Sequence, residues 1–137
     1  ATTDPGDDYM NDPIVKEKGC AILKEGQYRG SHKIRLHAGK YPALGQKKPV
    51  KVYRDNNNDN KYDRNEAKVD EGLFGINIHR ATSRAGKTST YVDKWSAGCQ
   101  VISSNDDWNK FLKICERARD IHGNSFSYTL LSSKDIV

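Results

Sequence analysis

The segment Gly75–Ile102 contains one histidine and one cysteine, two residue types that together can carry out acyl transfer. His79 follows a short alternating apolar run, and Cys99 comes twenty residues later, just before a second apolar run. A cysteine thiol becomes a strong nucleophile when a nearby base removes its proton, and histidine is the commonest such base. Cys99 and His79 are therefore the candidate catalytic pair.

The alternative is that Cys99 is an unreactive core residue, because a lone cysteine usually behaves as a small hydrophobic side chain. Cys115 fits that interpretation, since it falls on the apolar stripe of a predicted helix, and Cys20 has apolar neighbours in the chain. Cys99 differs because it follows three small residues, from Ser96 to Gly98. A turn at this position can aim the N–H groups of Gly98 and Cys99 at a reacting carbonyl as an oxyanion hole. Spacing alone leaves both interpretations open.

The polar segment between the two candidates is predicted to be a loop of about fifteen residues, a length that is usual for functional loops. Tyr91 and Trp95 in this region are candidates for the wall of a substrate cleft. A third group should orient His79, and a backbone carbonyl near Ser96 is one candidate.

Two further histidines, His32 and His37, are five residues apart. In a strand they would point to opposite faces, so a shared metal site is not expected. His37 either lines the cleft or is a solvated side chain.

A second motif, DNNNDNKYDRNE at residues 55–66, has the spacing of an EF-hand calcium loop. Asn60 stands where glycine is usual, and asparagine also tolerates the left-handed conformation. The alternative is an Asn- and Asp-rich surface turn. We expect a structural calcium site and no switch, because no paired hand is present. The predicted ligands are Asp55, Asn57, Asp59, the carbonyl of Lys61, Asp63 and Glu66.

The elements that must position these residues are mostly strands. Alternation predicts strands at Cys20–Tyr28, Lys33–Tyr41, Val50–Arg54, Phe74–His79, Gly98–Ser103 and Phe126–Leu131, with a turn at Gly30 and Ser31. Asn105–His122 is the one clear helix, capped by Ser104 and ended by Gly123. Its apolar stripe comprises Trp108, Phe111, Leu112, Cys115 and Ala118. We expect a mainly β (α+β) single domain over residues 13–137, with the helix against the sheet, after a flexible arm at residues 1–12.

Composition limits the classes of partner. The chain has 137 residues and a formal net charge of +5, which suits an anionic partner such as the bacterial cell wall. The basic residues are spread along the chain, so nucleic-acid binding is not expected. No apolar run approaches a membrane span, and no cysteine pattern indicates zinc. A monomer is expected.

The phrases GINIHRA and WSAGCQV resemble the catalytic signature of the L,D-transpeptidase (YkuD-like) superfamily, as a compact variant found in phage and bacterial cell-wall proteins. That signature has a histidine after a hydrophobic strand, a variable loop, then Ser/Thr-His-Gly-Cys and a short strand. The resemblance covers Val50 to Leu131 and is sharp over Gly75–Ile102. It implies a β-sandwich or mixed sheet with a helix after the cysteine strand.

This chain departs from the family pattern around the cysteine. Ala97 replaces the usual histidine, and Gln100 and Val101 follow Cys99 where the family commonly has an arginine two residues after its cysteine. Arg80 replaces the small residue after the first histidine. It is a candidate for binding a stem-peptide carboxylate, or a solvated charge. These departures indicate that the chemistry is kept and that substrate recognition is altered.

The resemblance implies a cysteine enzyme that acts on peptidoglycan stem peptides without a catalytic cofactor. Cleavage is slightly favoured over crosslinking. The expected location is the cell wall or periplasm, reached by secretion or by delivery from a phage. The alternative is a non-catalytic wall-binding module that retains the fold.

Overall fold

The structure, a computed structural model, describes residues 21–54, 69–88 and 98–136. The strands are β1 (Ala21–Leu23), β2 (Gly26–His37), β3 (Tyr41–Gln46), β4 (Val50–Arg54), β5 (Val69–Gly72), β6 (Ile78–Arg80), β7 (Gln100–Ile102) and β8 (Phe126–Leu130). The helical elements are α3 (Asn105–His122) and the short 3-10 helix η2 (Ser133–Asp135). The predicted arm at residues 1–12 lies outside the described residues.

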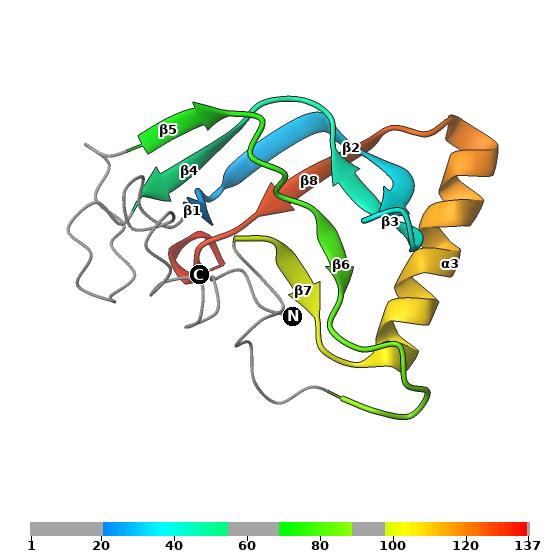
Figure 1. Cartoon of the computed structure of the whole chain (residues 1–137). Coiled ribbons are helices and arrows are strands. Elements are labelled where there is room, and N and C mark those ends of the chain that lie inside the picture. Colours follow the sequence, from blue (N-terminus) through cyan, green and yellow to red (C-terminus); the bar gives the residue numbers. More distant parts are fainter. Residues whose placement is uncertain (1–20, 55–68, 89–97, 137) are drawn as a thin grey trace.

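The strands form two sheets (Figure 1). One is a three-stranded antiparallel sheet in the order β1-β4-β5. The other is a five-stranded sheet in the order β7-β6-β3-β2-β8, and it is mixed because β6 and β7 are parallel while the other pairs are antiparallel. The described part of the chain carries one α-helix, so the predicted mainly β (α+β) class is confirmed.

The predicted helix is confirmed with its ends and its caps. The Ser104 side chain accepts a hydrogen bond from the Asp107 N–H at 3.3 Å, and Gly123 ends α3 with φ 94°. Trp108 and Cys115, both on the predicted stripe, are buried against the five-stranded sheet. The core between α3 and this sheet consists of Ile34, Ala43, Leu44, Ile78, Trp108 and Cys115.

A second core involves the three-stranded sheet and the segment that leads into β6. Its buried members are Ala21, Leu23, Val50, Val52 and Ile76. Tyr128 and Leu130 of β8 pack against this cluster, so the C-terminal strand joins the two sheets. The segment before β6 therefore packs in this second core through Ile76, and β6 itself packs in the first core through Ile78.

The predicted turn at Gly30 and Ser31 is wrong. β2 runs through both residues, and its pairing with β8 is irregular between Tyr28 and His32. Gly30 has φ 61°, a left-handed conformation. This conformation accommodates an irregularity within the strand and does not reverse the chain direction. The reversal comes later, at Ala38 (φ 51°) and Gly39 (φ 69°).

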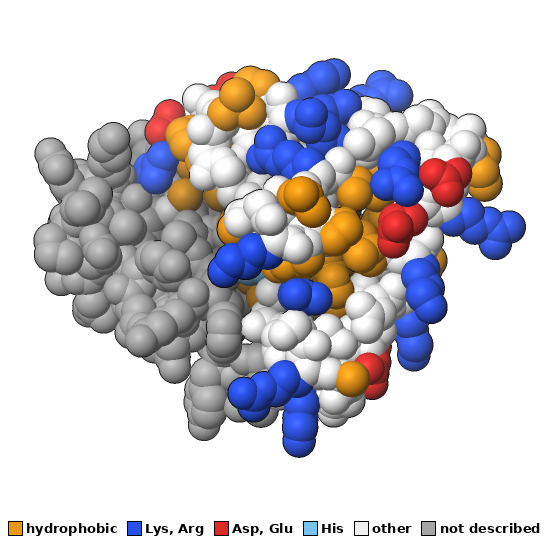
Figure 2. All heavy atoms as spheres, turned by 45° about the vertical axis from the view of Figure 1, so that its right-hand side comes forward, with side chains coloured by type: hydrophobic (Ala, Val, Ile, Leu, Met, Phe, Trp, Pro, Cys, Tyr) orange, Lys and Arg blue, Asp and Glu red, His pale blue; other side chains and the backbone are white. Residues whose placement is uncertain are grey.

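Figure 2 shows lysine and arginine side chains distributed over one face of the molecule, with hydrophobic side chains reaching the surface between them. This agrees with the spread of basic residues in the sequence. Within the described segments, no helix has both the length and the apolar character needed to cross a bilayer.

Candidate active site

The two strands that carry the candidate pair lie side by side (Figure 1). In the parallel register of β6 and β7, His79 is the partner of Val101. The ladder continues toward the N-terminal end, where the Gln100 N–H donates to the Asn77 carbonyl at 2.9 Å. The two strands are therefore direct neighbours in the sheet. Cys99 directly precedes β7, at this N-terminal end of the ladder.

Register also decides which way the side chains point. Ile78, Gln100 and Ile102 all line a cavity that includes residues of α3. Because alternate residues of a strand point to opposite faces, His79 points to the face away from that cavity. Cys99 is two residues from the partner of His79 and so belongs to the same face as His79. With ordinary strand spacings, about 8 Å separates their two Cα atoms.

His79 is buried and held in a defined protonation form. Its Nδ1 lies 2.9 Å from the Arg80 carbonyl oxygen. A carbonyl only accepts, so Nδ1 carries the proton and Nε2 of the neutral ring keeps its lone pair. Burial lowers the pKa of His79, which keeps the ring neutral near pH 7. The orienting group is thus the Arg80 carbonyl, whereas the sequence had pointed to a carbonyl near Ser96.

The imidazole of His37 packs on that of His79. The two rings are stacked, with centroids 4.5 Å apart and planes 18° apart. Burial, then the charges of His79 and Arg35, lowers the pKa of His37. Of the two interpretations of His37, the structure favours the one in which it belongs to the site.

Cys99 is half-buried, and its thiol donates to the Gly75 carbonyl at 3.3 Å. Burial raises the pKa of Cys99, and a hydrogen bond from the Asn77 backbone N–H opposes that rise. The resting cysteine is therefore a thiol at neutral pH. A base is required at the moment of attack.

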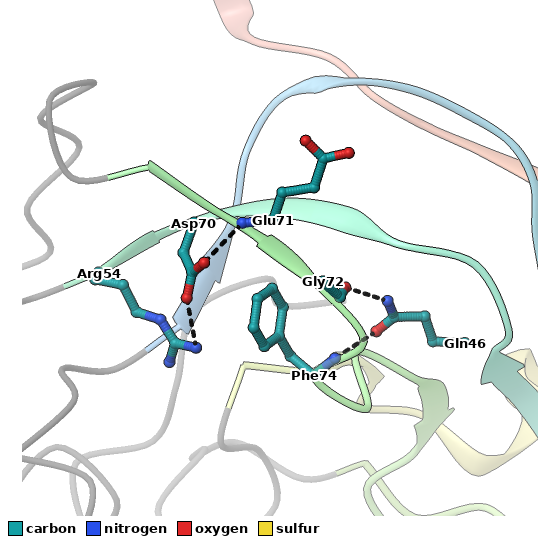
Figure 3. Close-up of polar contacts among 6 residues, drawn as sticks. All are labelled: Gln46, Arg54, Asp70, Glu71, Gly72 and Phe74. Atoms are coloured by element: carbon teal, nitrogen blue, oxygen red, sulfur yellow. Dashed lines mark hydrogen bonds and ion pairs between the residues drawn. The ribbon is translucent and has the colours of Figure 1, made fainter.

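A buried glutamine, which sequence reasoning missed, fixes the segment that accepts the Cys99 thiol. Gln46 at the end of β3 is 3% exposed. Its Oε1 accepts from the Phe74 N–H at 3.3 Å, and its Nε2 donates to the Gly72 carbonyl at 2.9 Å (Figure 3). The same Oε1 also accepts from the Ile76 N–H at 2.8 Å. These bonds flank Gly75 on both sides. No local sequence pattern signals this role, because it depends on contacts between residues about thirty positions apart.

Arg80 packs against an aromatic ring. Its guanidinium lies 3.9 Å from the centroid of the Tyr41 ring. Burial raises the pKa of Tyr41, the Arg80 backbone and charge lower it, and the charge of Cys99 raises it.

A polar hollow of about 380 Å³ lies beside His37. Its lining includes Arg35, Asn77 and Gly45. The Arg35 side chain crosses Gly45 so closely that a Cβ there would overlap its Nε. Glycine at position 45 thus allows an exposed arginine to lie flat across β3, near the two stacked histidines.

Comparisons with protein-family models, with curated proteins and with solved structures find no match for this chain. The proposed assignment of function therefore depends on the geometry and on the sequence motif.

Several predicted site residues lie outside the described residues. They are Ser96, Tyr91 and Trp95, together with the calcium ligands Asp55, Asn57, Asp59, Lys61, Asp63 and Glu66. In the described ranges, no group of three or more His, Cys, Asp or Glu side chains could hold a metal ion.

Gly98 is required by the packing next to Cys99. It has φ 121°, and a Cβ at this position would lie 2.6 Å from the Ala21 carbonyl oxygen of β1. The backbone of β1 therefore approaches the turn before Cys99 at a distance that only glycine permits.

Substitution of Gly98 by alanine is expected to destabilise the fold by about 3 kcal/mol, from backbone strain and overpacking. Urea denaturation measures this change. Gly39→Ala is the matched control, because Gly39 also has a positive φ of 69° but has no atom within 4 Å of its added Cβ. Its cost should be about 1 kcal/mol, from backbone conformation alone. Equal costs for the two variants would contradict the close approach of β1.

The ends of the predicted calcium loop are held together by β4 and β5. Tyr53 pairs with Val69, and Arg54 forms an ion pair with Asp70 at 3.4 Å (Figure 3). If the free calcium concentration is about a hundredfold above the Kd of the site, bound calcium raises the free energy of unfolding by about 2.7 kcal/mol. For a chain of this size, this corresponds to a Tm rise of roughly 10 °C.

Differential scanning calorimetry with calcium and with EGTA measures that shift. Glu66→Gln should remove it, since Glu66 is the predicted bidentate ligand. Glu71→Gln is the matched control and should keep it, because Glu71 is exposed and lies beyond the motif. An equal Tm with and without calcium would contradict the calcium prediction.

The pH dependence of Cys99 alkylation follows from its burial. Because burial raises the pKa of the thiol, the alkylation rate should reach half of its maximum above pH 8.5, the ordinary value for cysteine. Iodoacetamide labelling across pH, with peptide mapping to separate Cys99 from Cys20 and Cys115, measures this midpoint. A midpoint below pH 7 would show a resting thiolate–imidazolium pair and would contradict the protonation state assigned above.

Proposed function

We propose that this chain is a peptidoglycan-acting cysteine enzyme of the L,D-transpeptidase (YkuD-like) type. Cys99 is the nucleophile and His79 the general base. The observation that carries the proposal is the parallel pairing of β6, which contains His79, with β7, which begins one residue after Cys99. Water is slightly preferred over an amine as the acceptor, so the main reaction is cleavage of the stem peptide.

The reaction has two stages. The Cys99 sulfur attacks the carbonyl carbon of a stem-peptide bond while His79 Nε2 takes the thiol proton. The C–N bond breaks, His79 gives the proton to the leaving amine, and a thioester remains. Water or an amine then attacks the thioester carbonyl, and His79 takes a proton from this attacking molecule. The C–S bond breaks, and His79 returns that proton to the Cys99 sulfur, which restores the thiol. Backbone N–H groups of the Gly98–Cys99 turn are the proposed oxyanion donors.

The protonation states of the pair support this mechanism. A neutral His79 with its lone pair on Nε2 can accept a proton, and Nδ1 is held by the Arg80 carbonyl. A resting thiol needs such a base at the step of attack. The Arg80 carbonyl takes the part that an acidic side chain takes in other triads, since it fixes the tautomer of the histidine.

The charge of the chain supports an anionic substrate. The net charge of +5 and the basic surface in Figure 2 would keep the enzyme on an anionic wall. Arg80, Tyr91 and Trp95 are the proposed substrate-binding residues. Arg35 is a further candidate for the carboxylates of the stem peptide, because it lies exposed in the hollow beside His37. The proposed location is the cell wall or periplasm.

A second candidate function is a non-catalytic wall-binding module that keeps the fold. The observation that favours it is the state of Cys99, whose thiol donates to Gly75 and whose pKa is raised by burial. An unreactive structural cysteine has the same features.

Mass spectrometry of purified muropeptides after incubation with the protein distinguishes the two functions. Tripeptide, tetrapeptide and pentapeptide stems should be tested with calcium present. Loss of a terminal residue identifies cleavage, and new crosslinked masses identify transpeptidation. Cys99→Ala should abolish both, while Cys20→Ala, a matched cysteine replacement, should not. Unchanged masses for every stem, with retained wall binding, would support the binding module and contradict the enzyme.

A further inference from the structure

A second cavity lies on the other face of the five-stranded sheet, between the sheet and α3. Its volume is about 270 Å³. Six apolar or weakly polar side chains from both layers form most of its wall: Leu44, Ile78, Ile102, Phe111, Cys115 and Phe126. No acidic, lysine or arginine side chain is among its described lining residues. Its chemistry is therefore opposite to that of the polar hollow beside His37.

One polar group in this wall is buried and has no partner. Gln100 is 4% exposed and lines the cavity. Its Oε1 accepts a hydrogen bond from the Tyr128 hydroxyl at 3.0 Å, but its Nε2 has no hydrogen-bond partner among the described residues. A buried donor without a partner is uncommon and costly in a folded protein.

The other polar side chains of the wall are already satisfied. His32 Nε2 donates to the Ile76 carbonyl at 2.8 Å, so its Nδ1 accepts from the Ser31 hydroxyl at 2.7 Å. The Ser127 hydroxyl accepts from the Gly30 N–H at 2.9 Å. The cavity thus combines an apolar wall with one buried, unpartnered donor, the Nε2 of Gln100.

We propose that this cavity binds a small, uncharged, mainly apolar molecule with one acceptor oxygen, such as an aryl or alkyl ketone. The oxygen accepts the hydrogen bond from Gln100 Nε2, and the hydrocarbon part contacts the side chains from α3 and the sheet. A cavity of about 150 Å³ holds benzene, so this cavity accommodates about ten non-hydrogen atoms. The proposal does not depend on the function proposed for Cys99, which lies on the other face.

The competing occupant is water. A buried water usually makes about three hydrogen bonds, whereas this wall offers one unpartnered donor and a largely apolar surface. An uncharged organic molecule satisfies the donor and also buries its own apolar surface.

Two probes of equal size test the proposal on the full chain. Acetophenone and isopropylbenzene each have nine non-hydrogen atoms, and only acetophenone carries an acceptor oxygen. Ligand-observed NMR titration should show saturable binding of both. In Gln100→Leu, a change of similar size, the affinity for acetophenone relative to isopropylbenzene should fall about fivefold, the usual effect of one hydrogen bond, while isopropylbenzene still binds.

The position of the probes is read from Cys115, which lines the cavity. Bound acetophenone should slow the alkylation of Cys115 and leave that of Cys99 unchanged. Cys99→Ala should bind acetophenone like the wild type, even though it lacks the proposed nucleophile. Absence of saturable binding by either probe would indicate water alone and overturn the proposal. An unchanged relative affinity of the two probes in Gln100→Leu, or unprotected Cys115, would also overturn it.

Discussion

Cys99→Ala is expected to lower the proposed stem-peptide turnover at least about a thousandfold, because removal of the proposed nucleophile leaves only binding and oxyanion stabilisation. In the proposed reaction the Cys99 thiol forms the thioester. Alanine removes only the sulfur from a half-buried position, so the fold should be retained. The measurement is the initial rate of muropeptide cleavage, followed by chromatography and mass spectrometry.

The controls for this variant separate lost chemistry from lost structure. Its circular dichroism and Tm should stay close to those of the wild type. Its affinity for the stem peptide should also be retained, since binding uses other side chains. A Cys99→Ala protein that keeps more than a tenth of the wild-type rate would rule out Cys99 as the nucleophile.

His79→Gln is expected to reduce kcat/KM roughly a thousandfold, within the usual range for loss of a general base. Glutamine is a suitable replacement because its amide N–H can still donate to the Arg80 carbonyl, which keeps the local structure. It has no group that can take a proton from Cys99 at neutral pH. The measurement is the same cleavage assay, with thermal denaturation as the test of folding.

The pH profile distinguishes a base from a structural residue. Burial lowers the pKa of His79, so the neutral base persists to a lower pH than for an ordinary histidine. The acid limb of kcat/KM in the wild type should therefore have its midpoint below pH 6.5, the ordinary histidine value. In His79→Gln this limb should disappear. An acid limb that stays in place in the variant would show that another group supplies the base.

The neighbouring His37 ring bears on the protonation state of His79. It stacks on His79 with a centroid distance of 4.5 Å, and its own pKa is lowered chiefly by burial. A positive charge on His37 would disfavour a positive charge on His79, so both rings are expected to be neutral near pH 7.

The pattern of residues along the chain was enough to predict the local elements. The spacing of Trp108 and Cys115, with Ser104 before the helix and Gly123 after it, predicts α3 with its bounds. Val50–Arg54 is correctly predicted as a strand from its alternation. These predictions succeed because periodicity and capping depend on neighbours within one or two turns of the same element.

Local pattern failed where the backbone makes distant contacts. Gly30 looks like a turn residue, yet pairing of β2 with β8 carries the strand through it. β5 begins in a polar stretch that showed no strand pattern, and it forms because it pairs with β4. Pairing with a partner strand satisfies the backbone groups whatever the side chains are, so composition does not reveal it.

The sequence by itself determined which residue types were available for chemistry, a cysteine after a glycine turn and a histidine after an apolar strand. Tertiary structure alone decided that β6 and β7 are parallel neighbours, that the Arg80 carbonyl orients His79, and that His37 stacks on it. It also decided that Gln46 holds the segment around Gly75. These features join residues distant in the chain. Their geometry follows from packing and from hydrogen bonding of buried polar groups, and short-range sequence patterns carry no information about either.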